Sequence, residues 1–171
     1  YLYPFWEYMY KNIFQCNLAL ESFAGSPVYG TNPEFITGLM AEARFIRAYC
    51  YFELVKNFER LPLLTATLSP EDLQKVTSSS QEEVYSQIEA DFAYAAHHLP
   101  DAYATVDLGR ATRGAAWAFL SKAYLFHEKW ALSKAYADSV IDHGPYALES
   151  TFGEIWDINN RNGIESIYEI Q

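Results

Sequence analysis

Apolar residues recur at three- and four-residue steps along most of the chain, a spacing typical of amphipathic helices. In the first segment these positions are Phe5, Tyr8, Met9, Ile13, Cys16, Leu20 and Phe23. The same pattern predicts five main helices, at about residues 2–23, 33–58, 80–99, 112–128 and 130–143. Alternation over residues 166–170 is consistent with a short strand or an extended segment.

Capping signals mark the helix boundaries. Pro33 is suited to the first turn of the second helix, and Gly144 is followed by Pro145 at the end of the fifth. The third helix follows a polar stretch, residues 65–80, and opens with a capping-box pattern. Two pairs fit that pattern, Ser79 with Glu82 and Ser80 with Glu83.

Internal similarity indicates how these helices pack. When the sequence is aligned with itself at a shift of 73 residues, Ala43, Ile46, Ala48 and Tyr51 align with Ala116, Phe119, Ser121 and Tyr124. Small residues that recur in this way let one helix approach its neighbour closely. Residues 114–147 also fit the 34-residue spacing of a tetratricopeptide repeat (TPR), with Ser133 as the small residue after the turn. We therefore predict an all-α fold, a superhelix of TPR-like αα-hairpins.

Composition narrows the possible functions. The 171 residues are 50% apolar and 17% aromatic, which suits one globular domain, and the formal net charge is -10. Such an acidic chain has no strongly positive surface that could neutralise the phosphates of a nucleic acid, so we expect no nucleic-acid binding. No apolar run reaches the roughly 20 residues of a membrane-spanning helix.

The sequence carries no recognisable catalytic or metal motif. The four histidines lack the spacing of paired ligands, and His97 and His98 suit the end of a helix instead. No nucleophile elbow, phosphate-binding loop or zinc-hydrolase motif occurs. The carboxylates Glu82, Glu83, Glu89 and Asp91 are expected on the solvated face of one helix. We predict no enzyme, no metal and no cofactor.

Two cysteines, Cys16 and Cys50, lie within apolar helical patterns. They are expected to be buried thiols. A disulfide between them is the alternative in an oxidising compartment.

Arg44 and Arg47 interrupt an otherwise apolar helix and could bind an anionic ligand. Arg110 and Arg113 bracket the start of the fourth helix, and for them we expect only a structural role. The more frequent role of such arginines is to tie adjacent helices together through carboxylates or helix-end carbonyls.

The aromatic residues divide into two groups. Five have helical spacing and are expected in the core: Tyr10, Tyr51, Phe52, Tyr124 and Phe126. Tyr29 and Tyr103 instead fall in predicted loops. Because sugars stack their C–H faces on exposed aromatic rings, these two tyrosines are the candidate ligand-binding residues.

Several segments, in order, resemble the SusD/RagB family of outer-membrane nutrient-binding lipoproteins. Tyr10-x-x-Ile13-x-x-x-Asn17 is similar to the family's Y-x-x-I-x-x-x-N helix. AEARFIRAYCYFELVKNF at residues 41–58, followed by Leu61-Pro62-Leu63, resembles its most recognisable stretch. Further similar segments are residues 83–100, GRATRGAAWAFLSKAYL at residues 109–125, Trp130, Tyr146-x-Leu148 and Glu165-Ser166-Ile167. Glu59-Arg60 stands where the family usually has Gly-rich residues.

The resemblance implies a non-catalytic protein on the outer face of the outer membrane. Such a protein holds an oligosaccharide or another nutrient and partners a SusC-like TonB-dependent transporter, to which its helices are a scaffold. Residues 1–171 would then be the helical, TPR-containing domain of a longer protein, truncated at both ends, with a lipid anchor upstream. The family's binding residues would lie outside these positions. The alternative from another class is a TPR-type scaffold for protein–protein interaction.

Overall fold

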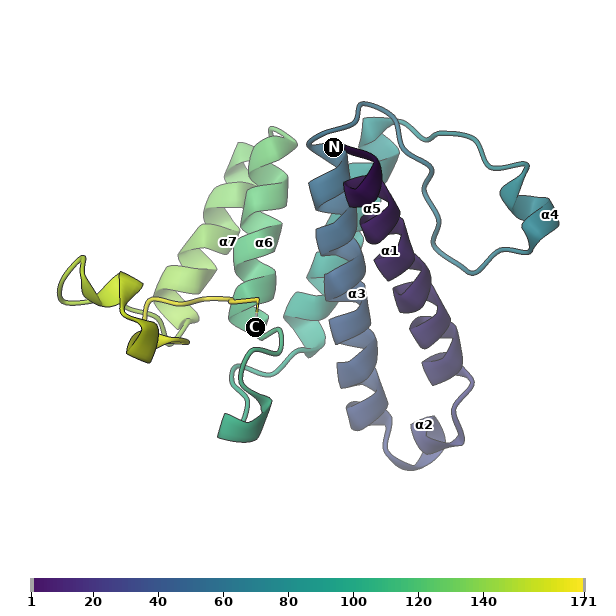
Figure 1. Ribbon diagram of the computed structural model, residues 1–171. Coiled ribbons are helices and arrows are strands. Elements are labelled where there is room, and N and C mark those ends of the chain that lie inside the picture. The colour runs from purple at the N-terminus through teal and green to yellow at the C-terminus, as the bar shows by residue number, and fades with distance from the viewer. Residues whose placement is uncertain (1, 171) are drawn as a thin grey trace.

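The computed structural model describes residues 2–170, and its architecture is helical (Figure 1). The five long helices are α1 (Leu2–Ala24), α3 (Pro33–Val55), α5 (Gln81–His98), α6 (Arg113–Phe126) and α7 (Trp130–His143). All five predicted helices are present. The second predicted helix ends three residues early, at Val55, because the chain turns there toward Leu61 and Pro62.

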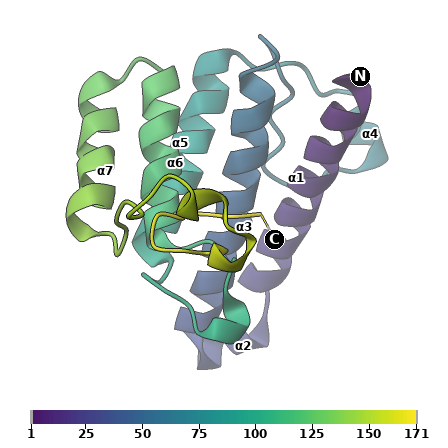
Figure 2. The ribbon, with the colours of Figure 1, turned by 60° about the vertical axis from the view of Figure 1, so that its left-hand side comes forward.

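The long helices run alternately up and down, and each packs against the next in the chain (Figure 2). The contacting pairs are α1 with α3, α3 with α5, α5 with α6, and α6 with α7. This serial stacking of antiparallel helices confirms the predicted all-α architecture of TPR-like αα-hairpins. Between Leu2 and Ile170, no helix combines the length and the hydrophobicity that crossing a bilayer requires.

Five short helical segments were not predicted. They are α2 (Pro27–Thr31), α4 (Pro70–Leu73), η1 (Thr105–Asp107), η2 (Glu154–Trp156) and η3 (Ile158–Asn160). Segments of three to five residues are too short to show a hydrophobic period. Ser26 and Ser69 each cap a short helix that starts with proline, so the local signal was present.

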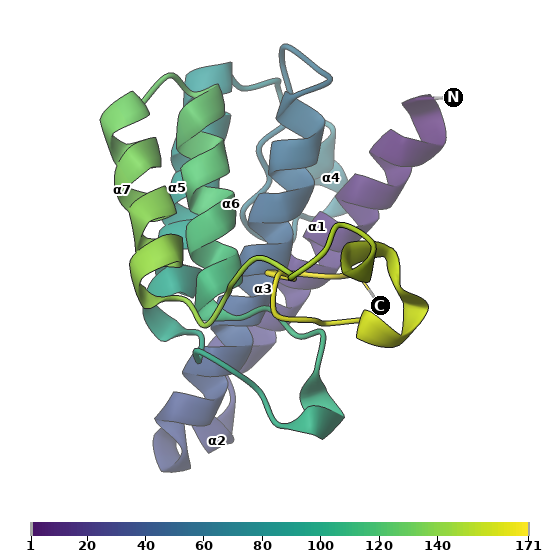
Figure 3. The ribbon, with the colours of Figure 1, turned by 90° about the vertical axis from the view of Figure 1, so that its left-hand side faces the viewer.

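The C-terminal segment is extended rather than a strand. Residues 166–170 belong to no sheet, and the β-pairing in the described residues is an isolated bridge between Leu61 and Ser79. In Figure 3 this segment, drawn in yellow, passes in front of α3 about midway along that helix. The extended alternative for residues 166–170 is therefore right, and the strand alternative is wrong.

Small residues allow the close helix packing that the 73-residue shift predicts. Ala48 and Ala116 are fully buried, and so is Tyr51. Between α6 and α7 the hydroxyl of Ser121 donates a 2.8 Å hydrogen bond to the carbonyl oxygen of Ser133. Ser133 is thus the small contact residue of the predicted repeat. Ile46, by contrast, is 44% exposed and does not follow the pattern.

Four of the five predicted core aromatics are buried or partly buried. Tyr51, Phe52 and Tyr124 are buried, and Tyr10 is partly buried with its hydroxyl donating to the carbonyl of Pro62 at 2.7 Å. Phe126 was predicted wrongly, because its side chain is 49% exposed. It is the last residue of α6, and its ring has an edge contact with Phe52 at a centroid distance of 5.4 Å.

One of the two predicted capping boxes forms, at Ser80 and Glu83. The Ser80 hydroxyl accepts from the Glu83 backbone N–H at 3.3 Å, and the Glu83 carboxylate accepts from the Ser80 N–H at 2.8 Å. We expect Ser80→Ala to lower the free energy of unfolding by about 1 kcal/mol, because an N–H of the first turn loses its acceptor. Urea denaturation measures this loss. Ser79→Ala serves as the matched control and should change stability by less.

A buried ion pair ties three helices together. Asp91 on α5 is fully buried and accepts two 2.8 Å hydrogen bonds, from Nε and Nη2 of Arg47 on α3. Nη1 of Arg47 also donates to Asn17 on α1 at 2.7 Å and to the carbonyl of Thr65 at 3.1 Å. The expectation that Asp91 lies on a solvated face is therefore wrong, since Arg47 supplies the counter-charge that makes its burial tolerable.

Arg44 also has a structural role. Its guanidinium lies 3.6 Å from Asp91 and 4.2 Å from the ring centre of Tyr94. Both arginines of this pair thus join α3 to α5, which is the more frequent of the two roles considered.

Both cysteines are buried free thiols. Burial raises the pKa of Cys16 to about 11 and that of Cys50 to about 12. Thiols with such pKa values carry little thiolate at neutral pH and are unreactive.

Candidate ligand-binding pocket

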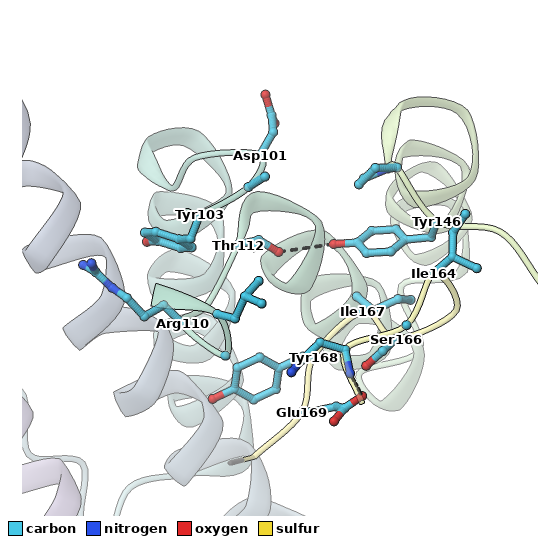
Figure 4. A pocket seen from close by; sticks show the side chains of 16 residues that line it. Asp101, Tyr103, Arg110, Thr112, Tyr146, Ile164, Ser166, Ile167, Tyr168 and Glu169 are labelled. Atoms are coloured by element: carbon cyan, nitrogen blue, oxygen red, sulfur yellow. Dashed lines mark hydrogen bonds between the residues drawn. The ribbon is translucent and has the colours of Figure 1, made fainter. Parts of the chain in front are cut away.

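A cavity of about 290 Å³ lies where three segments meet at one end of the helices (Figure 4). The segments are the loop between α5 and α6, the turn that follows α7, and residues 162–169 of the C-terminal segment. Three tyrosines from these segments line it, Tyr103, Tyr146 and Tyr168. Its volume is at the lower limit of ligand pockets, about 300 Å³.

Tyr103 is held in place by two charged residues. Its hydroxyl donates to a carboxylate oxygen of Glu42 on α3 at 3.2 Å, and the guanidinium of Arg110 lies 4.5 Å from its ring centre. Burial and the nearby Glu42 carboxylate raise the pKa of Tyr103 to about 12. Its hydroxyl therefore stays protonated, and hence a hydrogen-bond donor, at any physiological pH.

Arg110 is fixed by carboxylates outside the cavity. Its Nε donates to Glu42 at 3.1 Å, its Nη2 donates to the other oxygen of Glu42, and its Nη1 donates to Asp107 at 3.2 Å. Gly109 precedes it with a φ of 95°, a backbone conformation that favours glycine. The turn at Gly109 thus orients Arg110 toward α3.

Tyr146 closes another side of the pocket and depends on two glycines. Its hydroxyl lies 3.2 Å from the hydroxyl of Thr112, the N-cap of α6. A Cβ at Gly114 would lie 2.3 Å from the Tyr146 hydroxyl, and one at Gly144 would lie 2.5 Å from its ring. The ring fits only because both positions lack a side chain.

This close approach predicts opposite signs for two glycine-to-alanine changes. Gly38→Ala in α3 meets no atom within 4 Å and should raise the free energy of unfolding by about 1 kcal/mol through helix propensity. Gly114→Ala should instead lower it by about 1 kcal/mol, because overpacking against Tyr146 exceeds the same gain. Thermal unfolding of the two variants checks the signs. An equal rise in both would show that Tyr146 does not pack on Gly114.

Tyr168 forms the inner wall. Its ring centre lies 5.3 Å from that of Phe45 and 6.0 Å from that of Phe119, both as edge contacts. Tyr168 therefore connects the C-terminal segment to the aromatic core between α3, α5 and α6.

Polar groups are interspersed between the rings. Ser166, Asn162 and Glu169 line the pocket on the C-terminal side, and Asp101 lines it on the loop side. Asp101 pairs with Arg113 at 2.9 Å, so the second arginine pair has, like the first, structural ion partners. Aromatic walls with hydroxyl, amide and carboxylate groups suit the binding of a polar ring compound. Among residues 2–170, no group of three or more His, Cys, Asp or Glu side chains could hold a metal ion.

The structure separates the two candidate tyrosines. Tyr103 lines the pocket, whereas Tyr29 lies on α2, 43% exposed and outside it. Sequence reasoning missed Tyr146 and Tyr168 as pocket residues. Both follow the last long helix, where no periodic pattern remained to place them. Tyr146 falls within a similar segment of the SusD/RagB resemblance, and Tyr168 comes directly after another, Glu165-Ser166-Ile167.

The fold is thus a serial stack of TPR-like hairpins with a small polar-aromatic pocket at one end. Residues 1–125 match the SusD-like family described as "Starch-binding associating with outer membrane". The chain belongs to the SusD-like family.

Known relatives agree with this assignment. SusD-like protein P25 of Formosa agariphila is 26% identical over 96% of this chain and 31% of its own length. A SusD-like protein structure from Bacteroides fragilis has a TM-score of 0.90 at 30% identity, over 98% of this chain and 33% of that one. A laminarin-binding SusD-like protein has a TM-score of 0.91 at 31% identity, over 96% of this chain and 36% of that one. The chain thus spans about a third of the length of its relatives.

Proposed function

We propose that this protein is a non-catalytic, glycan-binding protein of the cell surface that takes part in oligosaccharide uptake. The observation that carries this proposal is the agreement in both sequence and fold with the laminarin-binding relative, 31% identical with a TM-score of 0.91. The pocket around Tyr103 supports it, since a sugar requires aromatic rings on which to stack and polar groups with which to form hydrogen bonds. We propose Tyr103 as a ligand contact, whereas Tyr29, outside the pocket, remains a candidate without further support.

Residues 1–171 would act as the helical domain of a longer SusD-like protein. Its coverage of about a third of each relative supports this division. The longer protein would be lipid-anchored on the outer face of the outer membrane and would partner a SusC-like TonB-dependent transporter. The family description, which associates starch binding with the outer membrane, favours this role over that of a TPR-type interaction scaffold.

Affinity electrophoresis tests glycan binding directly. The purified chain is run in native gels that contain laminarin, with bovine serum albumin as the non-binding control. We expect laminarin to slow the chain relative to albumin. Equal migration with laminarin and with a panel of other polysaccharides would contradict glycan binding by this chain.

A cellular experiment tests the location and the transporter partner. An epitope-tagged copy of the protein in its source organism should fractionate with the outer membrane and be cleaved when protease is added to intact cells. It should co-purify with a TonB-dependent transporter identified by mass spectrometry. Recovery from the soluble cell interior would contradict the proposal.

A further inference from the structure

The pocket around Tyr103 contains a single cation among its described lining residues, Arg110, and that cation is already bound. Glu42 engages it through both carboxylate oxygens, and Asp107 engages its remaining terminal nitrogen. In Figure 4 the guanidinium points toward the helix that carries Glu42 and away from the cavity. An anionic ligand in the cavity would have to compete with two carboxylates for this arginine.

The remaining charges of the lining are negative. Glu169 accepts from the backbone N–H of Asn162 at 2.8 Å, and hydrogen bonds from Ser166 and Asn162 lower its pKa, so it is ionised at neutral pH. Asp101 is 72% exposed beside its partner Arg113. The whole chain carries a formal charge of -10, which repels anions at longer range.

A neutral sugar needs no free cation and is not repelled by the negative charges of the pocket. Its hydroxyls both donate and accept, so they match carboxylates, the Ser166 hydroxyl and the Asn162 amide alike. Its C–H faces suit the rings of Tyr103, Tyr146 and Tyr168.

We propose that the pocket formed by Tyr103, Tyr146 and Tyr168 is a subsite for one ring of a neutral oligosaccharide and selects against uronic-acid sugars. This proposal rests on the proposed function as a glycan-binding protein and adds the charge class of the glycan. A pocket of about 290 Å³ accommodates a single ring. So few contacts give weak affinity, on the order of millimolar.

Saturation-transfer NMR on the purified chain detects binding of that strength. The probes are laminaritriose, which is neutral, and trigalacturonate, which has the same length and three carboxylates. We expect laminaritriose to bind and trigalacturonate to bind at least about tenfold more weakly in low-salt buffer. The reason is that Arg110, the cation of the described lining, is already paired with Glu42 and Asp107 and cannot neutralise the carboxylates of trigalacturonate. Tyr103→Leu should abolish most of the laminaritriose signal, while circular dichroism confirms that the variant is folded.

A variant that is expected to gain binding tests the charge argument more safely, because a loss of folding cannot produce a gain of binding. Glu42→Gln removes the carboxylate that occupies Arg110, so trigalacturonate binding should rise at least about fivefold relative to laminaritriose binding. Glu53→Gln is the matched control. It makes the same change of charge on the same helix at a carboxylate paired with Lys56, about 16 Å along the axis.

The outcomes distinguish this proposal from the proposed function. Equal binding of the two trisaccharides by the wild-type chain would overturn charge selection, and so would equal gains in Glu42→Gln and Glu53→Gln. Laminaritriose binding that Tyr103→Leu leaves intact would overturn the pocket as the subsite but leave glycan binding standing. Failure of every neutral and anionic glycan to bind would contradict the proposed function itself.

Discussion

Asp91→Ala should destabilise the protein by about 3–5 kcal/mol, the largest effect that we expect from any single polar substitution. Asp91 is fully buried and accepts two hydrogen bonds from Arg47, whose side chain is 5% exposed. Its removal leaves a buried guanidinium without a counter-charge. Urea denaturation followed by circular dichroism measures the loss, which for a domain of this size is a large part of the total stability.

Two controls sharpen this prediction. Asp138→Ala removes the partner of Lys134 in an exposed α7 pair and should change stability by less than about 0.5 kcal/mol. The double change Arg47→Met with Asp91→Leu removes both charges and should cost less than Asp91→Ala alone. A loss below about 1 kcal/mol for Asp91→Ala would mean that Arg47 gains another partner or solvent when Asp91 is absent.

Phe45→Ala should lower the free energy of unfolding by about 3–5 kcal/mol. The Phe45 side chain is 1% exposed, and its ring has edge contacts with Phe92, Phe119 and Tyr168 at centroid distances of 5.5, 5.4 and 5.3 Å. Truncation leaves a cavity where the core meets the inner wall of the pocket. The measurement is chemical denaturation, with the NMR signals of Tyr168 as a local report.

The matched control for this core truncation is Phe152→Ala. Phe152 is 76% exposed in the C-terminal region, so its loss should change stability by less than about 0.5 kcal/mol. If Phe45→Ala destabilised the protein no more than Phe152→Ala, the core contact with Tyr168 would have to be discarded.

Local sequence signals predicted the long helices well. The hydrophobic period, the Ser80 capping box and the Gly144 stop are all short-range features, so their structural outcome depends little on distant residues. Small residues on a helical stripe similarly predicted the close contact at Ser133, because only helix packing explains their repetition.

Features that depend on distant partners were predicted less well. Aspartate side chains are mostly exposed to solvent, so the local sequence predicts exposure for Asp91. Nothing near Asp91 in the sequence shows that Arg47, 44 residues away, will neutralise it. The pocket poses the same difficulty. Tyr103 could be nominated because it lies in a loop, whereas Tyr146 and Tyr168 reach the cavity only through the path of the chain after α7.

The serial packing of the long helices also has a consequence for the speed of folding. Because each long helix contacts chiefly the one that follows it, most stabilising contacts join segments close in sequence. Chains with such low contact order fold rapidly, in microseconds to milliseconds for helical domains. The Arg47 cluster is the exception, since it joins α1, α3 and α5 and requires that all three be in place. We therefore expect helix pairing to precede closure of this ion pair, so Arg47 and Asp91 should contribute much to stability and little to the folding rate.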